Sequence, residues 1–327
     1  MSTTLPNSAA TTASPLAEVN GQSAITFENV SRTYRRGWLS RGGTDALSDV
    51  SLSVPVGQVT AVLGANGAGK TTAIRCLLGL ERPDAGTVRV LGQAPGADIR
   101  RQIGYVAEKP ELYDWMSVEE TGWFAAGFYP DGYLDAFTRW CRRLDVDAAA
   151  KVGALSKGMK AKVALSLALA HDPPLLVLDE PTSGLDPLVR REFLESMIGV
   201  AAEGRTVLLC SHQVAEVERV ADRAVVLIGG HVVAEESLEQ LRAECVELAL
   251  RPGEEIGDPP GRVLAREDGR DERRLLVRGA NEAALASWEA EVGPVTRRRP
   301  NLEDILLALL RQARGPKEDD PPTSQAA

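Results

Sequence analysis

The chain has 327 residues, a formal net charge of −9 at pH 7 and four cysteines. This length exceeds a single small core and allows two domains, one of them sizeable. The acidic balance argues against a general nucleic-acid binder, which would show a basic excess. The four cysteines have no paired spacing, which argues against a disulfide framework or a zinc site. No run approaches eighteen consecutive apolar residues, so we expect no membrane-spanning segment.

The two ends of the chain differ from the rest in composition. Residues 1–24 are rich in Ser, Thr, Ala and Pro, and they have neither a basic start nor an apolar stretch. This segment is therefore not a secretory signal. We predict disordered tails at residues 1–24 and 313–327, because such compositions bury too little apolar surface to fold.

Between the tails, short apolar runs alternate with helical patterns, which indicates an α/β fold. Four runs suit parallel strands that helices cover on both faces: QVTAVLG (58–64), LLVLDE (175–180), TVLLCSH (206–212) and RAVVLIGG (223–230). The run TVRVLG (87–92) predicts a strand of a separate antiparallel layer, and HVV (231–233) is a second candidate for that layer.

Residues 110–172 have no comparable strand signal, so we predict a helical subdomain there, inserted into the sheet order. A Pro- and Gly-rich loop at 252–261 marks a change of texture. After it we expect two short strands that meet near Asp268, then helices at 281–292 and 302–312, the second capped by Asn301. The predicted domains are a main domain at 25–245 and a small α+β domain at 246–312.

The segment GANGAGKTT (64–72) lies between a predicted strand and a predicted helix and matches the phosphate-loop pattern G-x-x-x-x-G-K-[ST]. Its glycines allow the backbone N–H groups and the helix N-terminus to face an anion. Lys70 is expected to reach the β- and γ-phosphates of a nucleotide, and the Thr71 hydroxyl to bind Mg²⁺. The residues predicted to hold the nucleotide here are Asn66, Gly67, Ala68, Gly69, Lys70, Thr71 and Thr72.

A pair of carboxylates follows a second predicted strand. Asp179 and Glu180 end the run LLVLDE, at the edge of the sheet where ligands of open α/β folds bind. We predict that Asp179 holds Mg²⁺ and that Glu180 is the general base for an attacking water. The turn SGLD (183–186) follows at once, and its Asp186 is predicted to belong to the same nucleotide pocket. His212, after the next strand, could donate a hydrogen bond to the γ-phosphate.

The segment ALSKGMK (154–160) precedes an alanine- and leucine-rich run. Ser156 there suits the N-cap of an ordinary helix. The same serine could instead be half of a site that a second molecule completes, and composition and spacing leave both interpretations open.

Taken together and in order, these motifs resemble the ATP-binding subunit of an ABC transporter over roughly residues 25–245. The likeness comprises a strand with Tyr34, then GANGAGKTT, IGYVAE, ALSKGMK, LLVLDEPTSGLD and SH. It implies a P-loop NTPase fold with a helical subdomain and an antiparallel β layer. It also implies binding and hydrolysis of ATP with Mg²⁺. The segment 246–312 resembles the appended domain of ATPases that serve bacterial drug, peptide and polysaccharide exporters.

The resemblance also implies partners. In this family two nucleotide-binding domains meet head to tail, so Ser156 and Gly158 of one chain would face the γ-phosphate held by the loop of a second copy. An integral-membrane permease would be a separate chain that docks on the helical subdomain, with Glu111 and Tyr113 as candidate contacts. The protein would then lie at the cytoplasmic face of the plasma membrane, bound through the permease, with no nucleic-acid partner.

Four positions depart from the family pattern or leave alternatives open. Lys157 replaces the usual glycine, and it either contacts phosphate or points into water. Glu108 replaces the usual glutamine, and it either binds Mg²⁺ or acts only at the subdomain hinge. Tyr34 fits the adenine-stacking aromatic, with Trp38 as a rival in a segment that is several residues longer than usual.

The sequence thus predicts an ATPase that powers a membrane exporter through closing and opening of a dimer. Two other hypotheses remain, a soluble ABC ATPase that acts on ribosomes or DNA, and a nucleotide-sensing regulator. The basic run 297–299 suits either contact with lipid or permease, or a solvated surface.

Overall fold

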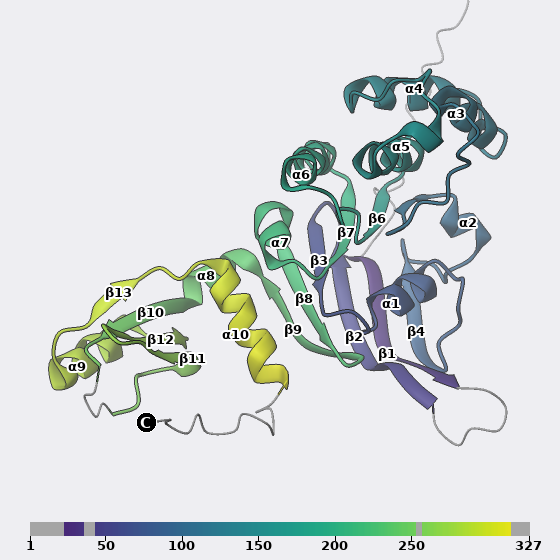
Figure 1. The fold of residues 1–327 in the computed structure, drawn as a ribbon. Coiled ribbons are helices and arrows are strands. Elements are labelled where there is room, and N and C mark those ends of the chain that lie inside the picture. Colours follow the sequence, from purple (N-terminus) through teal and green to yellow (C-terminus); the bar gives the residue numbers. More distant parts are fainter. Residues whose placement is uncertain (1–22, 36–42, 253–256, 315–327) are drawn as a thin grey trace, which may run out of the picture.

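The computed structural model describes residues 23–35, 43–252 and 257–314 (Figure 1). Most of the two predicted tails, and Trp38, lie outside the described residues. The first strand begins at Ser23 and the last helix ends at Arg314, so each predicted tail overlaps a regular element by two residues. This is a correction of the boundaries 24 and 313.

A six-stranded sheet forms the centre of the fold, in the order β5-β6-β7-β3-β8-β9. Its strands are β3 (Val59–Leu63), β5 (Ile103–Val106), β6 (Leu175–Asp179), β7 (Thr206–Ser211), β8 (Arg223–Ile228) and β9 (His231–Ser237). The first five are parallel, and every residue of β3, β6 and β7 is buried, as expected for a sheet covered on both faces.

A second, antiparallel sheet has the order β2-β1-β4. Its strands are β1 (Ser23–Arg35), β2 (Gly43–Pro55) and β4 (Ala85–Val90). Helix α1 (Lys70–Leu77) packs between this sheet and the central one, and its Ile74 and Leu77 belong to the core that both sheets share (Figure 1). The prediction for 87–92 is confirmed, but that for 231–233 is wrong. Those residues pair antiparallel with β8, because the tight turn at 229–230 folds the chain back onto the edge of the central sheet.

Helices cover the other face of the central sheet (Figure 1). They are α3 (Val118–Ala126), α4 (Tyr133–Arg143), α5 (Lys157–Leu169), α6 (Pro187–Ala201) and α7 (Val214–Val220). A short helix α2 (Ala97–Arg100) precedes β5, and its Ile99 is buried in the core on the α1 side. Within 110–172 the described chain forms helices and one isolated β-bridge but no strand. Phe137 of α4 and Phe193 of α6 are fully buried in this layer.

The C-terminal residues form a four-stranded antiparallel sheet in the order β11-β12-β10-β13. Its elements are α8 (Leu238–Glu244), β10 (Cys245–Leu250), β11 (Arg262–Asp268), β12 (Arg273–Arg278), α9 (Glu282–Val292), β13 (Thr296–Arg298) and α10 (Leu302–Arg314). Helix α9 packs on one face of this sheet, and α10 packs between the other face and α7 (Figure 1). The Asn301 side chain caps α10 by accepting the Asp304 N–H at 2.7 Å, as predicted.

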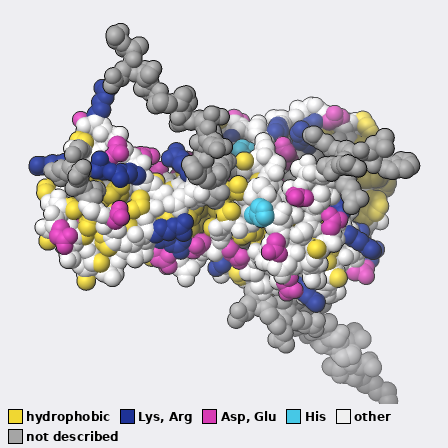
Figure 2. Space-filling view, turned by 90° about the horizontal axis from the view of Figure 1, so that it is seen from below, with side chains coloured by type: hydrophobic (Ala, Val, Ile, Leu, Met, Phe, Trp, Pro, Cys, Tyr) yellow, Lys and Arg dark blue, Asp and Glu magenta, His cyan; other side chains and the backbone are white. Residues whose placement is uncertain are grey.

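Arg297 and Arg298 of the basic run lie in β13 and are ion-paired. Arg297 contacts Glu289 and Glu282, and Arg298 contacts Glu272 at 2.9 Å. On the face shown in Figure 2, basic and acidic side chains are interspersed, with no continuous basic surface. The arginines of β13 therefore act first as partners of neighbouring carboxylates.

Candidate nucleotide-binding and hydrolysis site

A cleft of about 340 Å³ opens beside the phosphate loop. A cleft of this size suits a small-molecule ligand. The residues that line it are Thr44, Asp45, Ala46, Asn66, Gly67, Ala68, Gly69, Lys70, Thr71, Thr72, Glu108 and Glu180. The structure thus brings the whole predicted phosphate loop together with Glu108 and Glu180, which come from distant parts of the sequence.

The loop connects buried β3 to α1, and its backbone geometry requires glycine at the start of the helix. Gly69 has φ 111°, and a Cβ atom there would lie 2.4 Å from the Ala46 carbonyl oxygen. A side chain would therefore meet both backbone strain and a fixed backbone neighbour. The helix begins directly after Gly69, so its free N–H groups face the cleft, an arrangement that suits a phosphate.

Lys70 is buried and its ammonium is fully engaged. Its Nζ donates to the carbonyl oxygen of Gly64 at 2.6 Å and lies 3.1 Å from Glu180 Oε1. The chain thus holds one cation at the phosphate loop and neutralises it with the predicted base. A phosphate that enters the cleft offers the lysine an alternative anionic partner.

The Thr71 hydroxyl and Asp179 lie together below the loop. Thr71 Oγ1 donates to Asp179 Oδ2 at 3.2 Å, whereas the buried Oδ1 has no hydrogen-bond partner among the described residues. An unpartnered carboxylate oxygen beside a hydroxyl fits a hard cation such as Mg²⁺. The described residues contain no cluster of three His, Cys, Asp or Glu side chains that could hold a metal. The chain alone therefore offers few ligands, and such a cation would bind together with nucleotide phosphates.

Burial raises the pKa of Asp179, and the hydrogen bond from Thr71 opposes this effect. The folded chain therefore binds a proton at Asp179 more readily than the unfolded chain does. Ionisation of Asp179 therefore costs the folded chain stability. This cost grows as the pH rises above the Asp pKa of the unfolded chain, about 4, and is complete above the pKa of the folded chain. At neutral pH, Asp179 is a destabilising group in the nucleotide-free chain.

We therefore expect Asp179→Asn to raise the melting temperature of the nucleotide-free protein at pH 7.5 by about 2–4 °C. The gain should shrink when the pH is lowered toward about 4. Thermal unfolding at both pH values measures the effect. Asp98→Asn is the control, because the Asp98 side chain is 93% exposed and its substitution should change neither value. A lower melting temperature for Asp179→Asn at pH 7.5 would contradict this account of the site.

Glu180 and His212 form the second pair of the site. His212 Nδ1 lies 2.7 Å from Glu180 Oε2, and Glu180 is 8% exposed. Glu180 also has φ 49°, in the left-handed region that a residue with a side chain seldom adopts. Such strain persists only where neighbours hold the backbone, and here the Glu180 N–H donates to the Cys210 carbonyl at 3.0 Å.

The predicted residues of the segment ALSKGMK (154–160), and Asp186, do not line this cleft. Ser156 caps α5 by accepting the Met159 N–H at 3.2 Å, and Asp186 caps α6 in the same way. Both are exposed. Gly158 is buried against α6, so closely that a Cβ there would lie 2.3 Å from Val189 Cγ1. The ammonium of exposed Lys157 lies beside Gly184, in the turn that ends at Asp186.

Tyr34 is also absent from the cleft lining. It lies in β1, and its hydroxyl donates to Glu81 Oε2 at 2.5 Å, with Arg32 over its ring. Its predicted role in adenine stacking remains a prediction, and its rival Trp38 is outside the described residues.

Sequence reasoning missed the β2 residues of the cleft. Thr44, Asp45 and Ala46 line it, yet nothing in their local sequence distinguishes them from other strand residues. They enter the site only because β2 crosses the loop near Gly69.

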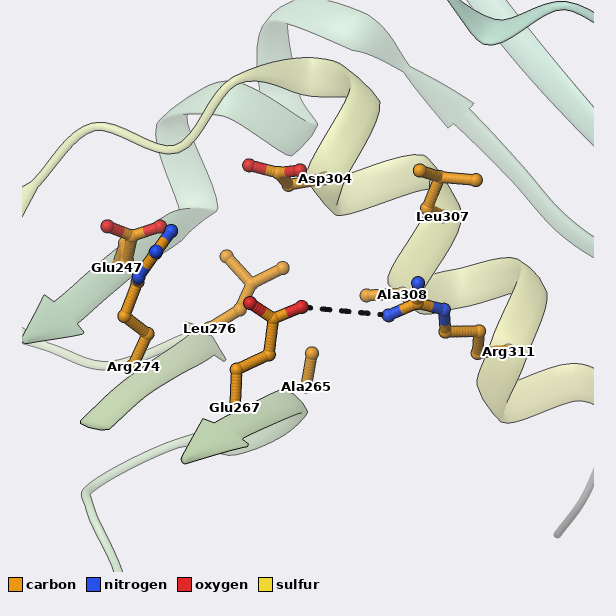
Figure 3. Close-up of a pocket in the computed structure, with 9 residues that line it drawn as sticks. All are labelled: Glu247, Ala265, Glu267, Arg274, Leu276, Asp304, Leu307, Ala308 and Arg311. Carbon is orange, nitrogen blue, oxygen red and sulfur yellow. Dashed lines mark ion pairs between the residues drawn. The ribbon is translucent and has the colours of Figure 1, made fainter. Parts of the chain in front are cut away.

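A second pocket lies between the C-terminal sheet and α10 (Figure 3). It holds only about 90 Å³, far less than the range typical of nucleotide-sized ligands. Both of its arginines have protein partners. Arg311 lies 3.8 Å from Glu267, and Arg274 lies 3.0 Å from Glu272. The phosphate-loop cleft is therefore the candidate functional site.

Comparison with known proteins agrees with the phosphate-loop cleft as the functional site. The sequence model of the family described as ABC transporter matches residues 47–183. An uncharacterized ABC transporter ATP-binding protein of Nostoc is 37% identical over 238 residues, which cover 69% of this chain and 70% of that protein. The chain belongs to the ATP-binding proteins of ABC transporters.

Two further ABC proteins show how far the similarity extends. A Nod factor export ATP-binding protein of Rhizobium etli is 32% identical over 301 residues, covering 88% of this chain and 93% of that protein. A methionine import ATP-binding protein of Caulobacter vibrioides is 38% identical over 230 residues, covering 66% and 68%. Export and import proteins thus both occur among the ABC relatives.

Solved ABC structures share the fold. The ATP-binding subunit of an ABC transporter superposes with a TM-score of 0.58 at 33% identity, covering 68% of this chain and 92% of that one. A dimeric ATP-binding cassette in a post-hydrolysis state, bound to ADP and Pi, superposes with a TM-score of 0.59 at 25% identity, covering 65% and 98%. The predicted fold class, a P-loop ATPase of the ABC type, is confirmed.

Proposed function

We propose that this chain is the ATP-hydrolysing subunit of a membrane exporter and that nucleotide closes and opens a dimer of it. The observation that carries the proposal is that Lys70 and Glu180 line one phosphate-loop cleft. Asp179 and His212 lie directly behind that lining, in contact with Thr71 and Glu180. Each group matches a step of phosphoryl transfer to water.

The proposed roles follow from the contacts of each residue. Lys70 exchanges Glu180 for the β- and γ-phosphates, which frees the carboxylate to accept a proton from water. His212 lies against Glu180 and would hold its orientation, and its other ring nitrogen would donate a hydrogen bond to the γ-phosphate. Thr71, Asp179 and Glu108 would hold Mg²⁺, which neutralises charge on the phosphates when bound.

A second copy of the chain would complete the site. Ser156 and Lys157 are exposed and do not line the chain's own cleft, although Ser156 begins a helix whose N-terminus suits a phosphate. In a head-to-tail dimer, Ser156, Lys157 and Gly158 would face the γ-phosphate on the partner, and Asp186 would border the same interface. ATP then joins the two copies, and hydrolysis releases them.

The proposed permease contact is an exposed group of aromatic side chains before, within and just after α3, here called the aromatic surface. Its members are Tyr113, Trp115, Trp123, Phe124 and Phe128, which are 41–71% exposed. Tyr113 lies 5.8 Å from both Trp115 and Phe124, and Phe124 lies 5.7 Å from Phe128, so these four rings form one patch. Trp123 is the neighbour of Phe124 in α3. A contiguous exposed aromatic patch is unusual on a monomer and indicates a protein partner. The described residues contain no helix long and apolar enough to cross a membrane, so this proposal assigns the spans to a separate chain.

Replacing part of the aromatic surface should therefore separate hydrolysis from membrane binding. We expect Trp123→Ser with Phe128→Ser to lower recovery of the chain with its membrane fraction by at least about tenfold. ATP turnover of the purified variant should stay near that of the wild type. Leu80→Ser is a matched control, because Leu80 is 61% exposed but lies outside the aromatic surface. Equal recovery of the double variant and the control would contradict this surface as the docking site.

The direction of transport rests on the C-terminal segment. The match to the Rhizobium etli export protein covers 88% of this chain and so extends beyond residues 25–245, whereas two other export proteins cover 64% and the import protein covers 66%. The decisive test is the gene next to this one. If it encodes a six-span membrane protein, its co-purification with this chain should depend on the aromatic surface. The proposal fails if the chain associates with no membrane protein in its native membrane.

A further inference from the structure

The described residues include a buried carboxylate that the roles above do not use. Glu216 lies in α7 and is 3% exposed. Its two oxygens have different partners, since Oε1 accepts the Thr182 hydroxyl at 2.5 Å and Oε2 accepts the Ser211 hydroxyl at 2.7 Å. Both hydroxyl residues are themselves buried. One side chain thus joins two chain segments that are 29 positions apart.

Each of these two segments carries one member of the pair Glu180 and His212. Thr182 is two residues after Glu180, in the turn that ends at Asp186, and Ser211 immediately precedes His212. The Ser211 carbonyl also accepts the Gly64 N–H at 3.4 Å, at the start of the phosphate loop. The contact of 2.7 Å between Glu180 and His212 therefore joins the same two segments that Glu216 joins.

Arg190 of α6 supplies the charge that a buried carboxylate needs. Its Nε lies 3.6 Å from Glu216 Oε1, and its Nη2 donates to the Leu185 carbonyl at 3.1 Å. Its Nη1 donates to the Gln213 side chain, which follows His212. The arginine therefore contacts the same two segments as Glu216. The buried core of this network, Glu216 with its two hydroxyl partners, favours one arrangement, because separating the carboxylate from either hydroxyl leaves a buried polar group unsatisfied.

We propose that Glu216 is a positioning residue for hydrolysis. It fixes the turn that carries Glu180 against the segment that carries His212, so that base and histidine keep the geometry that the reaction needs. A displacement of about 1 Å at a reacting group can cost about 100-fold in rate. This inference rests on the proposed ATPase function and adds a residue that does not itself touch the nucleotide.

The test removes the two hydroxyl hydrogen bonds of Glu216 in one set of variants, which keeps the carboxylate charge, and removes the charge in another variant. Thr182→Val keeps the volume and deletes one hydroxyl, Ser211→Ala deletes the other, and the double variant deletes both. Glu216→Gln is a further variant that keeps the shape of the buried side chain. We expect kcat for ATP to fall about 10- to 100-fold in the double variant and in Glu216→Gln, and less in the single variants. The KM for ATP and the equilibrium affinity for ATP should stay within about threefold, because the phosphate loop is intact.

A matched control is a second carboxylate–hydroxyl pair away from the cleft. Glu235 Oε1 accepts the Ser53 hydroxyl at 3.0 Å, between β2 and β9. Glu235→Gln and Ser53→Ala should lower thermal stability at most, with kcat near that of the wild type. A loss of kcat in the Glu216 set that exceeds the loss in the control set, at similar melting temperatures, supports positioning.

Two outcomes overturn the inference. The first is a kcat within about twofold of the control set in the double variant and in Glu216→Gln, which would make Glu216 a purely structural group. The second is a parallel loss of ATP affinity and kcat, which would place its effect on the phosphate loop. A wild-type chain that does not hydrolyse ATP would refute the proposed function and this inference with it. If the wild type hydrolyses ATP and the Glu216 variants do so equally well, only this inference fails.

Discussion

Glu180→Gln is expected to lower ATP turnover by at least about 100-fold, because an amide cannot accept the proton of the attacking water. The amide oxygen can still face Lys70, and the amide group can still bond to His212, so the cleft should keep its shape and its affinity for ATP. A variant that binds ATP without hydrolysing it should remain in the closed, dimeric state. Turnover is measured as phosphate release, and the dimer by size-exclusion chromatography with and without ATP.

A matched control for this experiment is Glu235→Gln, which makes the same chemical change at a half-buried position outside the cleft. It should hydrolyse ATP like the parent. Equal, near-zero rates in the parent and in Glu180→Gln would favour a nucleotide-sensing regulator over an ATPase. Equal, high rates in both would mean that another group is the base.

Mixing two inactive variants should restore activity if the site is shared between two copies. Lys70→Met removes the phosphate-loop cation, and Ser156→Arg blocks the exposed helix N-terminus while leaving the phosphate loop unchanged. In a mixed dimer, one of the two sites combines an intact phosphate loop with an intact Ser156. Random pairing makes half of the dimers mixed, so the equimolar mixture should regain roughly a quarter of wild-type turnover.

The control mixture combines Lys70→Met with a chain that carries both substitutions. No dimer in that mixture has an intact site, so no activity should return. If the first mixture shows only the average of its two components, each chain contains a complete site of its own. Ser156 would then be a helix cap and nothing more.

The parts of the site that could be predicted from the sequence are those with local chemistry. The phosphate loop needs glycines at fixed spacing before a helix, and Asp179 with Glu180 needs only a buried strand that ends at the sheet edge. The structure places Lys70, Asp179, Glu180 and His212 as close together as that reasoning requires. Their roles in hydrolysis remain predictions that the variants above would test.

The parts that could not be predicted depend on tertiary packing. Glu216 has the sequence context of an ordinary surface helix, and only the crossing of α6, α7 and the end of β7 buries it. Strand β13 was missed because it has three residues and pairs only with β10. The segment 231–233 was assigned to the wrong sheet, because a period-2 pattern does not say which edge a strand will join.

The contact between Lys70 and Glu180 has a consequence for the order of events in one catalytic cycle. While the cleft is empty, the carboxylate serves as the counter-ion of the lysine and has no freedom to deprotonate a solvent molecule. Under the proposed roles, the arriving triphosphate takes the place of the carboxylate on the lysine, and this exchange would free the carboxylate to act as base. Substrate recognition and activation of the base would then be a single event.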